Sequence, residues 1–251
     1  METITSRTNP LMTHIRKLSS SGSYRRQQGE FLCDSPKLLR EALLWKAEVC
    51  TVVCTDPDEL PPLDKAIRCV QVPQDVMASI SPMKTPQGVL FTCRLPEKKL
   101  PEKLCGKHYM VLDGVQDPGN VGTIWRTADA FDCDGLLLLA GCADPYSAKT
   151  VRASMGAVFR CPVWQCDASE MHELLRDSGL PLYGAALRED TLDARSVDYS
   201  RAALAIGSEG RGLTEEVLAL CDKTIRIPMS ERCESLNAAI AATVLLWEVY
   251  R

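Results

Sequence analysis

Three loops of this 251-residue chain bring together glycines and polar side chains that could do chemistry. The first loop, residues 113–126, carries Asn120 and Arg126. Asn120 stands where it could cap a helix, and the apolar residues that follow share one helical stripe from which Arg126 is excluded. Arg126 is therefore either a solvated side chain or a guanidinium beside a strand end, where it could grip a phosphate with two hydrogen bonds.

The second loop, residues 206–213, has its glycines in the order G-x-x-G-x-G and carries one carboxylate, Glu209. Glycines allow a ligand to approach the backbone closely. The order differs from the G-x-G-x-x-G of dinucleotide-binding loops, and no acidic residue ends a second strand at the expected spacing. A nicotinamide-dependent oxidoreductase is therefore disfavoured. Glu209 is either a loop carboxylate bonded to nearby amides or a functional group.

The third loop, residues 227–237, carries Ser235 and Asn237 just before the apolar run 238–247. Either side chain can cap the helix that follows, and capping alone would explain both. This helix is apolar on every side except Thr243. We therefore predict that it is buried all round, in a core or in a subunit interface.

Alternating strands and helices must position these loops, and the pattern is that of an α/β protein. The strands predicted before residue 95 are 31–33, 49–54, 68–72 and 89–93, with helices at 10–18, after Ser35, and at 74–80. The strands predicted after residue 107 are 109–112, 135–139, 163–165, 182–186, 202–206 and 224–227. The helices predicted there are 121–131, 147–155, 169–177, 214–220 and one from about 236. Repeated strand–helix units predict a mostly parallel sheet, with ligands beyond the carboxyl ends of its strands.

A charged, proline-containing stretch at residues 95–106 is the best domain boundary. We predict a small α/β domain at residues 1–94, a linker at 95–106 and a second domain at 107–251. Residues 1–28 hold five basic side chains (Arg7, Arg16, Lys17, Arg25 and Arg26) and one acidic side chain, Glu2, a local charge of +4. This patch could meet phosphates or form a solvated helix face.

Composition excludes several classes of protein. Twelve cysteines occur without a C-x-x-C pair and with only three histidines, so we expect no metal site and interpret the cysteines as buried free thiols of a reducing compartment. No secretory signal precedes residue 10, and the longest apolar stretch, 238–247, is too short to span a bilayer. We therefore expect a cytoplasmic protein without a membrane partner.

Taken in order, the three loops resemble the SpoU/TrmH family of RNA 2′-O-ribose methyltransferases, within the SPOUT superfamily. The matching segments are 112–128 (LDGVQDPGNVGTIWRTA), 151–156 (VRASMG), 206–213 (IGSEGRGL), 227–229 (IPM) and 234–237 (ESLN). Residues 1–94 resemble the RNA-binding extension that precedes many such domains, through 4–10 (ITSRTNP), 24–26 (YRR) and 86–88 (PQG).

The resemblance implies more than the pattern of elements can. It implies a parallel-sheet SPOUT-type domain with a deep trefoil knot, S-adenosylmethionine as cofactor and a homodimer with the active site near the subunit interface. By motif position it assigns catalysis and substrate contact to Asn120, Arg126, Glu209, Ser235 and Asn237. It assigns cofactor binding, largely through the backbone, to Gly207, Ile227 and Leu236. The chain departs from the family pattern at Asp132 and at residues 230–233.

The expected reaction is methylation of a ribose 2′-hydroxyl in RNA by S-adenosylmethionine. The family's usual mechanism makes the arginine, here Arg126, a base assisted by an RNA phosphate. An arginine rarely gives up its proton, so Arg126 could instead stabilise negative charge on the oxygen and clamp the phosphate. The extended N-terminal region favours ribosomal RNA as substrate. Transfer RNA, and a non-catalytic RNA-binding homologue, are the alternatives.

Overall fold

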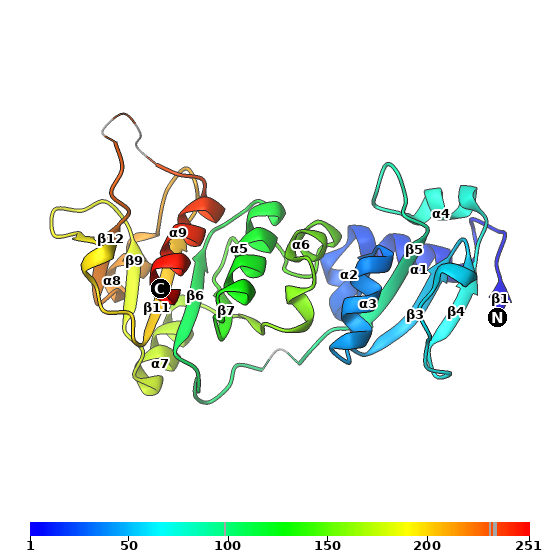
Figure 1. The fold of residues 1–251 in the computed structure, drawn as a ribbon, viewed down its shortest axis with the longest axis horizontal. Helices are drawn as coiled ribbons and strands as arrows, with labels where there is room; N and C mark the ends of the chain where they lie inside the picture. The colour runs from blue at the N-terminus through cyan, green and yellow to red at the C-terminus, as the bar shows by residue number, and fades with distance from the viewer. Residues whose placement is uncertain (98, 231, 233–234) are drawn as a thin grey trace. The chain divides into compact units, whose positions relative to one another are not determined.

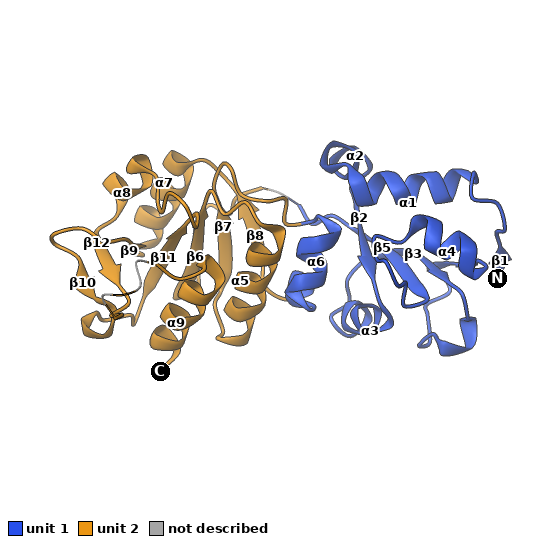
Figure 2. Ribbon diagram, turned by 90° about the horizontal axis from the view of Figure 1, so that it is seen from above, with its two compact units in different colours: residues 1–97, 146–159 blue, residues 98–145, 160–251 orange. Residues whose placement is uncertain are grey.

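The computed structural model describes residues 1–97, 99–230, 232 and 235–251; Lys98 of the predicted linker and Glu231, Cys233 and Glu234 of the third loop lie outside the described residues. The chain forms two compact units (Figure 1, Figure 2). Unit 1 consists of Met1–Glu97 with Tyr146–Phe159, and unit 2 of Lys98–Pro145 with Arg160–Arg251. The predicted domain boundaries treat 107–251 as continuous, and they stay a prediction.

Unit 1 is built on a five-stranded mixed sheet in the order β1-β4-β3-β5-β2. Its strands are β1 (Glu2–Thr3), β2 (Glu30–Asp34), β3 (Val49–Cys54), β4 (Arg68–Gln71) and β5 (Val89–Arg94). β5 runs antiparallel to both of its neighbours, and the other pairs are parallel. The β-branched residues of β3 and the burial of its last three positions suit a sheet that packs helices against it.

The helices of unit 1 include one from a distant part of the sequence. They are α1 (Pro10–Ser20), α2 (Gly22–Gln28), α3 (Pro36–Leu44), α4 (Gln74–Ile80) and α6 (Ala148–Ser154), with short 3-10 turns η1 (Pro57–Glu59) and η2 (Ala157–Phe159). Ile15 of α1 and Met77 of α4 share one apolar cluster with Val70 of the sheet. Figure 2 colours α6 with this unit, and the Arg152 guanidinium joins it to the Asp34 carboxylate of β2 at 2.7 Å.

Unit 2 is built on a seven-stranded sheet in the order β10-β12-β9-β11-β6-β7-β8. Its strands are β6 (His108–Asp113), β7 (Gly135–Leu138), β8 (Val163–Gln165), β9 (Leu182–Ala185), β10 (Leu192–Asp193), β11 (Ala202–Gly207) and β12 (Lys223–Arg226). Every pair in this sheet is parallel. The predicted α/β class and parallel sheet are therefore confirmed, and the trefoil knot stays a prediction.

Helices cover both faces of the unit 2 sheet. They are α5 (Pro118–Ala130), α7 (Ala168–Ser178), α8 (Glu215–Leu220) and α9 (Ala238–Tyr250), with the 3-10 turn η3 (Ala194–Ser196). Figure 2 shows α5 and α9 side by side on one face and α7 and α8 on the other. Burial of β11 along its whole length agrees with this two-sided cover.

One prediction about a helix was wrong, and another is met only in part. Asn120 does not cap α5, because the Asp117 side chain accepts from the Asn120 backbone N–H at 3.0 Å and Pro118 begins the helix. Helix α9 was predicted to be buried in a core or in a subunit interface; in the single chain Ile240, Val244, Trp247 and Tyr250 are 53%, 39%, 54% and 54% exposed, so the core does not cover this face and the interface stays a prediction. The opposite side of the helix packs on α5 and the sheet, which leaves one apolar face uncovered.

Some basic side chains of the predicted patch at residues 1–28 are buried or paired within unit 1. Arg25 is buried and its guanidinium donates to the Leu18 carbonyl oxygen. Arg7 pairs with Asp75 at 2.7 Å. Burial of one cation and pairing of another leave a smaller positive surface than residue counting predicts. Within the described residues no helix is long and apolar enough to cross a membrane.

Candidate active site

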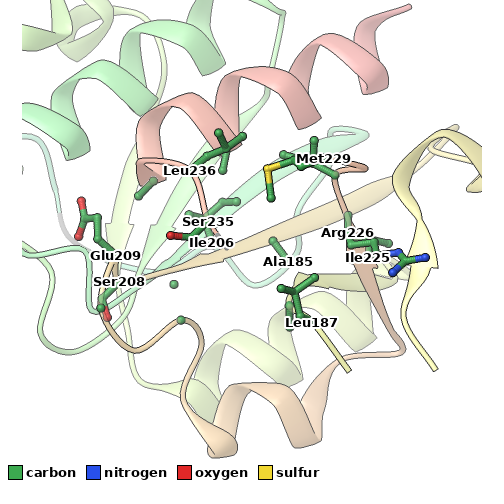
Figure 3. Close-up of a pocket in the computed structure, with 17 residues that line it drawn as sticks. Ala185, Leu187, Ile206, Ser208, Glu209, Ile225, Arg226, Met229, Ser235 and Leu236 are labelled. Carbon is green, nitrogen blue, oxygen red and sulfur yellow. The ribbon is translucent and has the colours of Figure 1, made fainter. Parts of the chain in front are cut away.

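A cavity of about 280 Å³ opens at the carboxyl ends of β9, β11 and β12 (Figure 3). This is the edge at which a parallel sheet is expected to bind its ligand. Residues that follow each strand line it: Leu187 after β9, Glu209 after β11 and Met229 after β12. Leu236, two residues before α9, and Ala241, in the first turn of α9, complete the wall. The cavity therefore collects segments that are far apart in the sequence.

The glycine loop after β11 can close only because Gly207 has no side chain. A Cβ atom at this position would lie 2.0 Å from the carbonyl carbon of Gly212. Ser208 and Gly212 exchange backbone hydrogen bonds of 3.1 and 2.9 Å across the loop, and Gly212 has a φ of +69°, which favours glycine. The first and last glycines of the G-x-x-G-x-G pattern, Gly207 and Gly212, are thus required by the shape of the loop, which holds Glu209 at the rim of the cavity.

A chain of side-chain hydrogen bonds joins the three loops. The Asn237 carbonyl oxygen accepts from the backbone N–H groups of Ala239 and Ile240 at 2.9 and 3.3 Å, so Asn237 is the cap of α9. Its amide nitrogen then donates to the Asn120 carbonyl oxygen at 3.2 Å, and the Asn120 amide donates to the Glu209 carboxylate. Because the helix N-terminus fixes which way the Asn237 amide faces, it also fixes the direction of the next two bonds.

A hydrogen bond outside this network also joins the first two loops. Asp113, at the end of β6, is buried, and its carboxylate accepts from the backbone N–H of Thr214 at 2.6 Å. Thr214 is the cap of α8, so the bond fixes where the glycine loop ends relative to β6. We assign Asp113 to holding the loops in register.

The predicted site residues fall into three groups. Gly207, Ile227, Ser235 and Leu236 line the cavity together with Glu209. Asn120 and Asn237 stand in the hydrogen-bonded network at its edge. Arg126 is exposed on α5, and among the described residues it makes no hydrogen bond or ion pair with the other predicted residues. Its part in the site stays a prediction.

The lining residues that were not predicted include three large side chains, Leu187, Arg226 and Met229. Each lies within three positions of the end of a strand in the parallel sheet. The rule that ligands sit beyond the carboxyl ends of parallel strands could have found them. Arg226 brings positive charge to the wall, and beside it Asp193 carries a lowered pKa of about 2, chiefly because the Arg195 guanidinium donates to it.

The lining suits a ligand that is planar and apolar in one part and polar in another. Leu187 and Met229 expose large apolar surfaces at the cavity. Among the described residues, the backbone N–H groups of Ile227 and Leu236 have no hydrogen-bond partner. Apolar walls with a few unpaired backbone donors are typical of small-molecule cofactor sites, so these residues fit S-adenosylmethionine.

No metal site accompanies the cavity within the part of the chain that the structure describes, where no three His, Cys, Asp or Glu side chains gather. The Cys142 thiol donates to the carbonyl oxygen of Leu112, just before the first loop, at 3.1 Å. Burial raises its pKa to about 11, so Cys142 stays a thiol at neutral pH. A thiol with a raised pKa is unreactive, which agrees with the interpretation of the cysteines as structural thiols.

Family models match both parts of the chain. The SpoU rRNA Methylase family matches residues 107–247, which include the whole cavity and its network. The chain belongs to the SpoU rRNA methylase family. An MRM3-like substrate binding domain matches residues 9–90, within unit 1.

Two named rRNA methyltransferases are similar along the whole chain. The 23S rRNA (guanosine(2553)-2′-O)-methyltransferase RlmP of Bacillus subtilis is 31% identical, over 99% of each chain. An AdoMet-bound rRNA methyltransferase from Sinorhizobium meliloti is 31% identical with a TM-score of 0.89, over 99% of this chain and 97% of that one.

The SpoU methyltransferase AviRb from Streptomyces viridochromogenes, in complex with AdoMet, is 27% identical with a TM-score of 0.85, over 97% of each chain. The predictions of an RNA methyltransferase and of S-adenosylmethionine as its cofactor are therefore confirmed.

Proposed function

We propose that this chain transfers a methyl group from S-adenosylmethionine to a ribose 2′-hydroxyl of ribosomal RNA. The observation that carries the proposal is the hydrogen-bonded network of Asn237, Asn120 and Glu209 at the edge of a cavity within the SpoU-matched segment. A polar cluster of this kind can receive a sugar hydroxyl beside the apolar cavity that holds the cofactor.

The chain's residues would chiefly bind and orient the two substrates. S-adenosylmethionine, when bound, supplies a methyl group already activated on a sulfonium. The apolar wall of Leu187, Met229 and Leu236 excludes water, and the backbone donors of Ile227 and Leu236 set the orientation. Correct positioning of two reactants is worth roughly 7–11 kcal/mol in favourable cases. Ser235, exposed at the cavity, adds a hydroxyl that could meet the RNA.

Arg126 is the residue we propose for the charge that develops on the attacking oxygen. A guanidinium keeps its proton and can hold an RNA phosphate with two parallel hydrogen bonds while it stabilises negative charge nearby. Among the described residues, Arg126 makes no hydrogen bond to Glu209 or Asn120. The proposal therefore requires RNA or a second subunit to bring Arg126 into the site.

The uncovered face of α9 supports the homodimer as part of this proposal. Ile240, Val244, Trp247 and Tyr250 form an apolar face on the element that Asn237 caps. Contiguous exposed apolar surface marks interaction sites in soluble proteins. A second copy of the chain that pairs through the same face would exclude this surface from water and bring a second Arg126 towards the region.

Ribosomal RNA is favoured over transfer RNA because full-length similarity runs to proteins named as rRNA methyltransferases. The MRM3-like substrate binding match in unit 1 supports an RNA-binding role for that part of the chain. Phosphate contacts from such a unit would position RNA without reading its sequence.

Transfer of tritiated methyl groups to total RNA tests the proposal. Purified protein, S-adenosylmethionine labelled in its methyl group and RNA that lacks native modification are incubated, and the RNA is digested to nucleosides. The expected label is in a 2′-O-methylnucleoside from ribosomal RNA. Label in a methylated base, or in transfer RNA alone, would overturn the proposal, and no transfer to any RNA would favour a non-catalytic RNA-binding homologue.

A further inference from the structure

Unit 1 contains a second cavity, of about 250 Å³, that the methyl transfer does not use. We call it the unit 1 cavity. It is lined by the junction of β2 and α3 at Asp34–Leu38, by Met77 of α4, by the loop that holds Met83 and Gln87, and by Arg152 and Met155 of the α6 segment. The VRASMG segment, which stood out in the sequence without a role at the first cavity, therefore forms one wall here.

The backbone at two lining positions adopts a conformation that L residues rarely take. Ser35 has a φ of +95° and Met155 a φ of +50°; among the described residues, only Lys46 and Asp132 are other non-glycine examples. Ser35 is held there by its side chain, which accepts from the Leu38 backbone N–H, and by its own N–H, which donates to the Val89 carbonyl oxygen. Such conformations persist only when the surroundings impose them, and they gather at ligand sites.

The cavity combines an adaptable apolar wall with polar groups at its rim. Met77, Met83 and Met155 supply unbranched thioether side chains that adjust to a planar ligand. Lys37 and Gln87 are exposed at the rim, and among the described residues neither side chain has a hydrogen-bond or ion-pair partner.

Lys37 also lies in the first turn of α3, where the helix dipole favours an anion. The Arg152–Asp34 pair, with its carboxylate buried, closes the cavity floor and fixes α6 to β2.

These features match one kind of ligand, an unpaired nucleotide. Its base is a planar ring with hydrogen-bonding edges, and its phosphate is an anion a short distance away. Proteins that read RNA sequence do so mainly on unstacked bases held between side chains. A peptide would need main-chain partners along an extended groove, which an enclosed cavity of this size does not supply.

We propose that the unit 1 cavity binds one unpaired base of the RNA, with Gln87 at the base edge and Lys37 at the phosphate. The inference rests on the proposed function for its ligand and adds to it a place where a nucleotide other than the methylated one is read. It would select the RNA by the identity of that base.

Methyl NMR of the full chain, labelled in its methionine methyl groups, tests the proposal. The protein is saturated with S-adenosylhomocysteine so that nucleotides cannot enter the first cavity, and four trinucleotides, each of a single base, are titrated separately. We expect at least one of them to shift the methyl signals of Met77, Met83 and Met155. Met229, which lines the first cavity, is the internal control and should not move.

Three variants complete the test. Lys37→Ala and Gln87→Ala should each weaken trinucleotide binding about tenfold, the loss that accompanies one strong polar contact. Lys84→Ala removes an exposed lysine that does not line the cavity and should change binding by less than about twofold.

The inference is overturned if no trinucleotide shifts the three methionines, or if Lys84→Ala weakens binding as much as Lys37→Ala. Methyl transfer to RNA by a chain that fails this test would leave the proposed function intact. Trinucleotide binding by a chain that transfers no methyl group would support the unit 1 cavity as a nucleotide site and overturn the proposed function.

Discussion

The Asn120 amide donates a hydrogen bond to the Glu209 carboxylate, 89 positions later in the chain. The two residues belong to different elements: Asn120 lies in the first turn of α5, and Glu209 lies in the glycine loop after β11. Asn237 completes the network from the start of α9. The predictions below follow from this convergence and from the apolar surfaces around it.

Asn237→Asp should separate the capping role of Asn237 from its role in the network. Aspartate caps a helix as well as asparagine does, so the thermal midpoint should stay within about 2 °C. The variant cannot donate to Asn120 and adds a negative charge near Glu209. Methyl transfer should therefore fall about tenfold in kcat/KM, the loss expected when a hydrogen bond worth roughly 1.4 kcal/mol is removed. Equal activity of the two proteins would show that the network is only structural.

Gly207→Ala should destabilise the fold, and Gly210→Ala should not. The new Cβ at position 207 would overlap the Gly212 backbone, whereas a Cβ at position 210 meets nothing within 4 Å. Overpacking against backbone costs about 3 kcal/mol or more, so chemical denaturation without cofactor should report that loss for Gly207→Ala alone. A loss below about 1 kcal/mol for Gly207→Ala would mean that the loop can open at little cost.

Arg126→Lys should lower the rate and spare cofactor binding. Lysine keeps the charge and loses the two parallel hydrogen bonds that hold a phosphate. We expect kcat to fall roughly 10²-fold, as when a group that stabilises a developing oxyanion is lost. Calorimetric binding of S-adenosylmethionine should change by less than about twofold. Arg176→Lys, at an exposed position of α7, is the control. Equal loss of rate and of cofactor affinity would contradict the role assigned to Arg126.

Trp247→Glu should produce a monomer. The Trp247 side chain is 54% exposed on the apolar face of α9, so a charge there would face the second subunit. Trp45→Glu is a matched control in unit 1, where Trp45 is 52% exposed. Sedimentation should give a dimer for the wild type and for Trp45→Glu, and a monomer for Trp247→Glu. A wild-type monomer at all concentrations would remove the dimer from the proposal.

Buried thiols should make the protein less stable at alkaline pH. Burial raises the pKa of Cys133 and of Cys166 from the ordinary 9.0 to about 12 in the folded chain. A raised pKa contributes stability that is present below pH 9 and is lost as the pH rises towards 12, because the unfolded chain then releases protons that the folded chain keeps.

Alkylation at pH 9 with mass spectrometry measures the burial of the thiols: exposed Cys105 should react, and buried Cys133 should not. Rapid modification of Cys133 in the folded protein would contradict the burial.

Local sequence patterns predicted most of the helices and strands, but they predicted much less of how those elements pack and which of their faces are buried. Strands 49–54 and 163–165 and helix 74–80 end where the structure ends them, because propensity and turn residues act over a few positions. The exposed side of α9 could not be predicted, since an all-apolar helix reads the same whether its last face meets a core or solvent. The packing of α6 in unit 1 could not be predicted either, because the sequence of residues 146–159 does not indicate which of the two sheets the segment packs on.

The candidate site was predicted through resemblance, and the structure explains why its residues need one another. Asn237, Asn120 and Glu209 are unremarkable singly, since each is a common cap or loop residue. Only the hydrogen bonds from the Asn237 amide to Asn120, and from the Asn120 amide to the Glu209 carboxylate, show that the three loops form one network. Leu187 and Arg226 were missed because they belong to no motif and take part only by standing at strand ends.

Mapping of 2′-O-methyl groups in ribosomal RNA tests the central claim most directly. RNA is compared from cells that contain this protein, from cells that lack its gene, and from cells in which only Arg126→Lys is supplied. We expect one ribose methyl group to disappear without the gene, to return with the wild-type protein and to stay absent or strongly reduced with the variant. Unchanged ribose methylation in all three, or loss of a methyl group from a base, would contradict the claim.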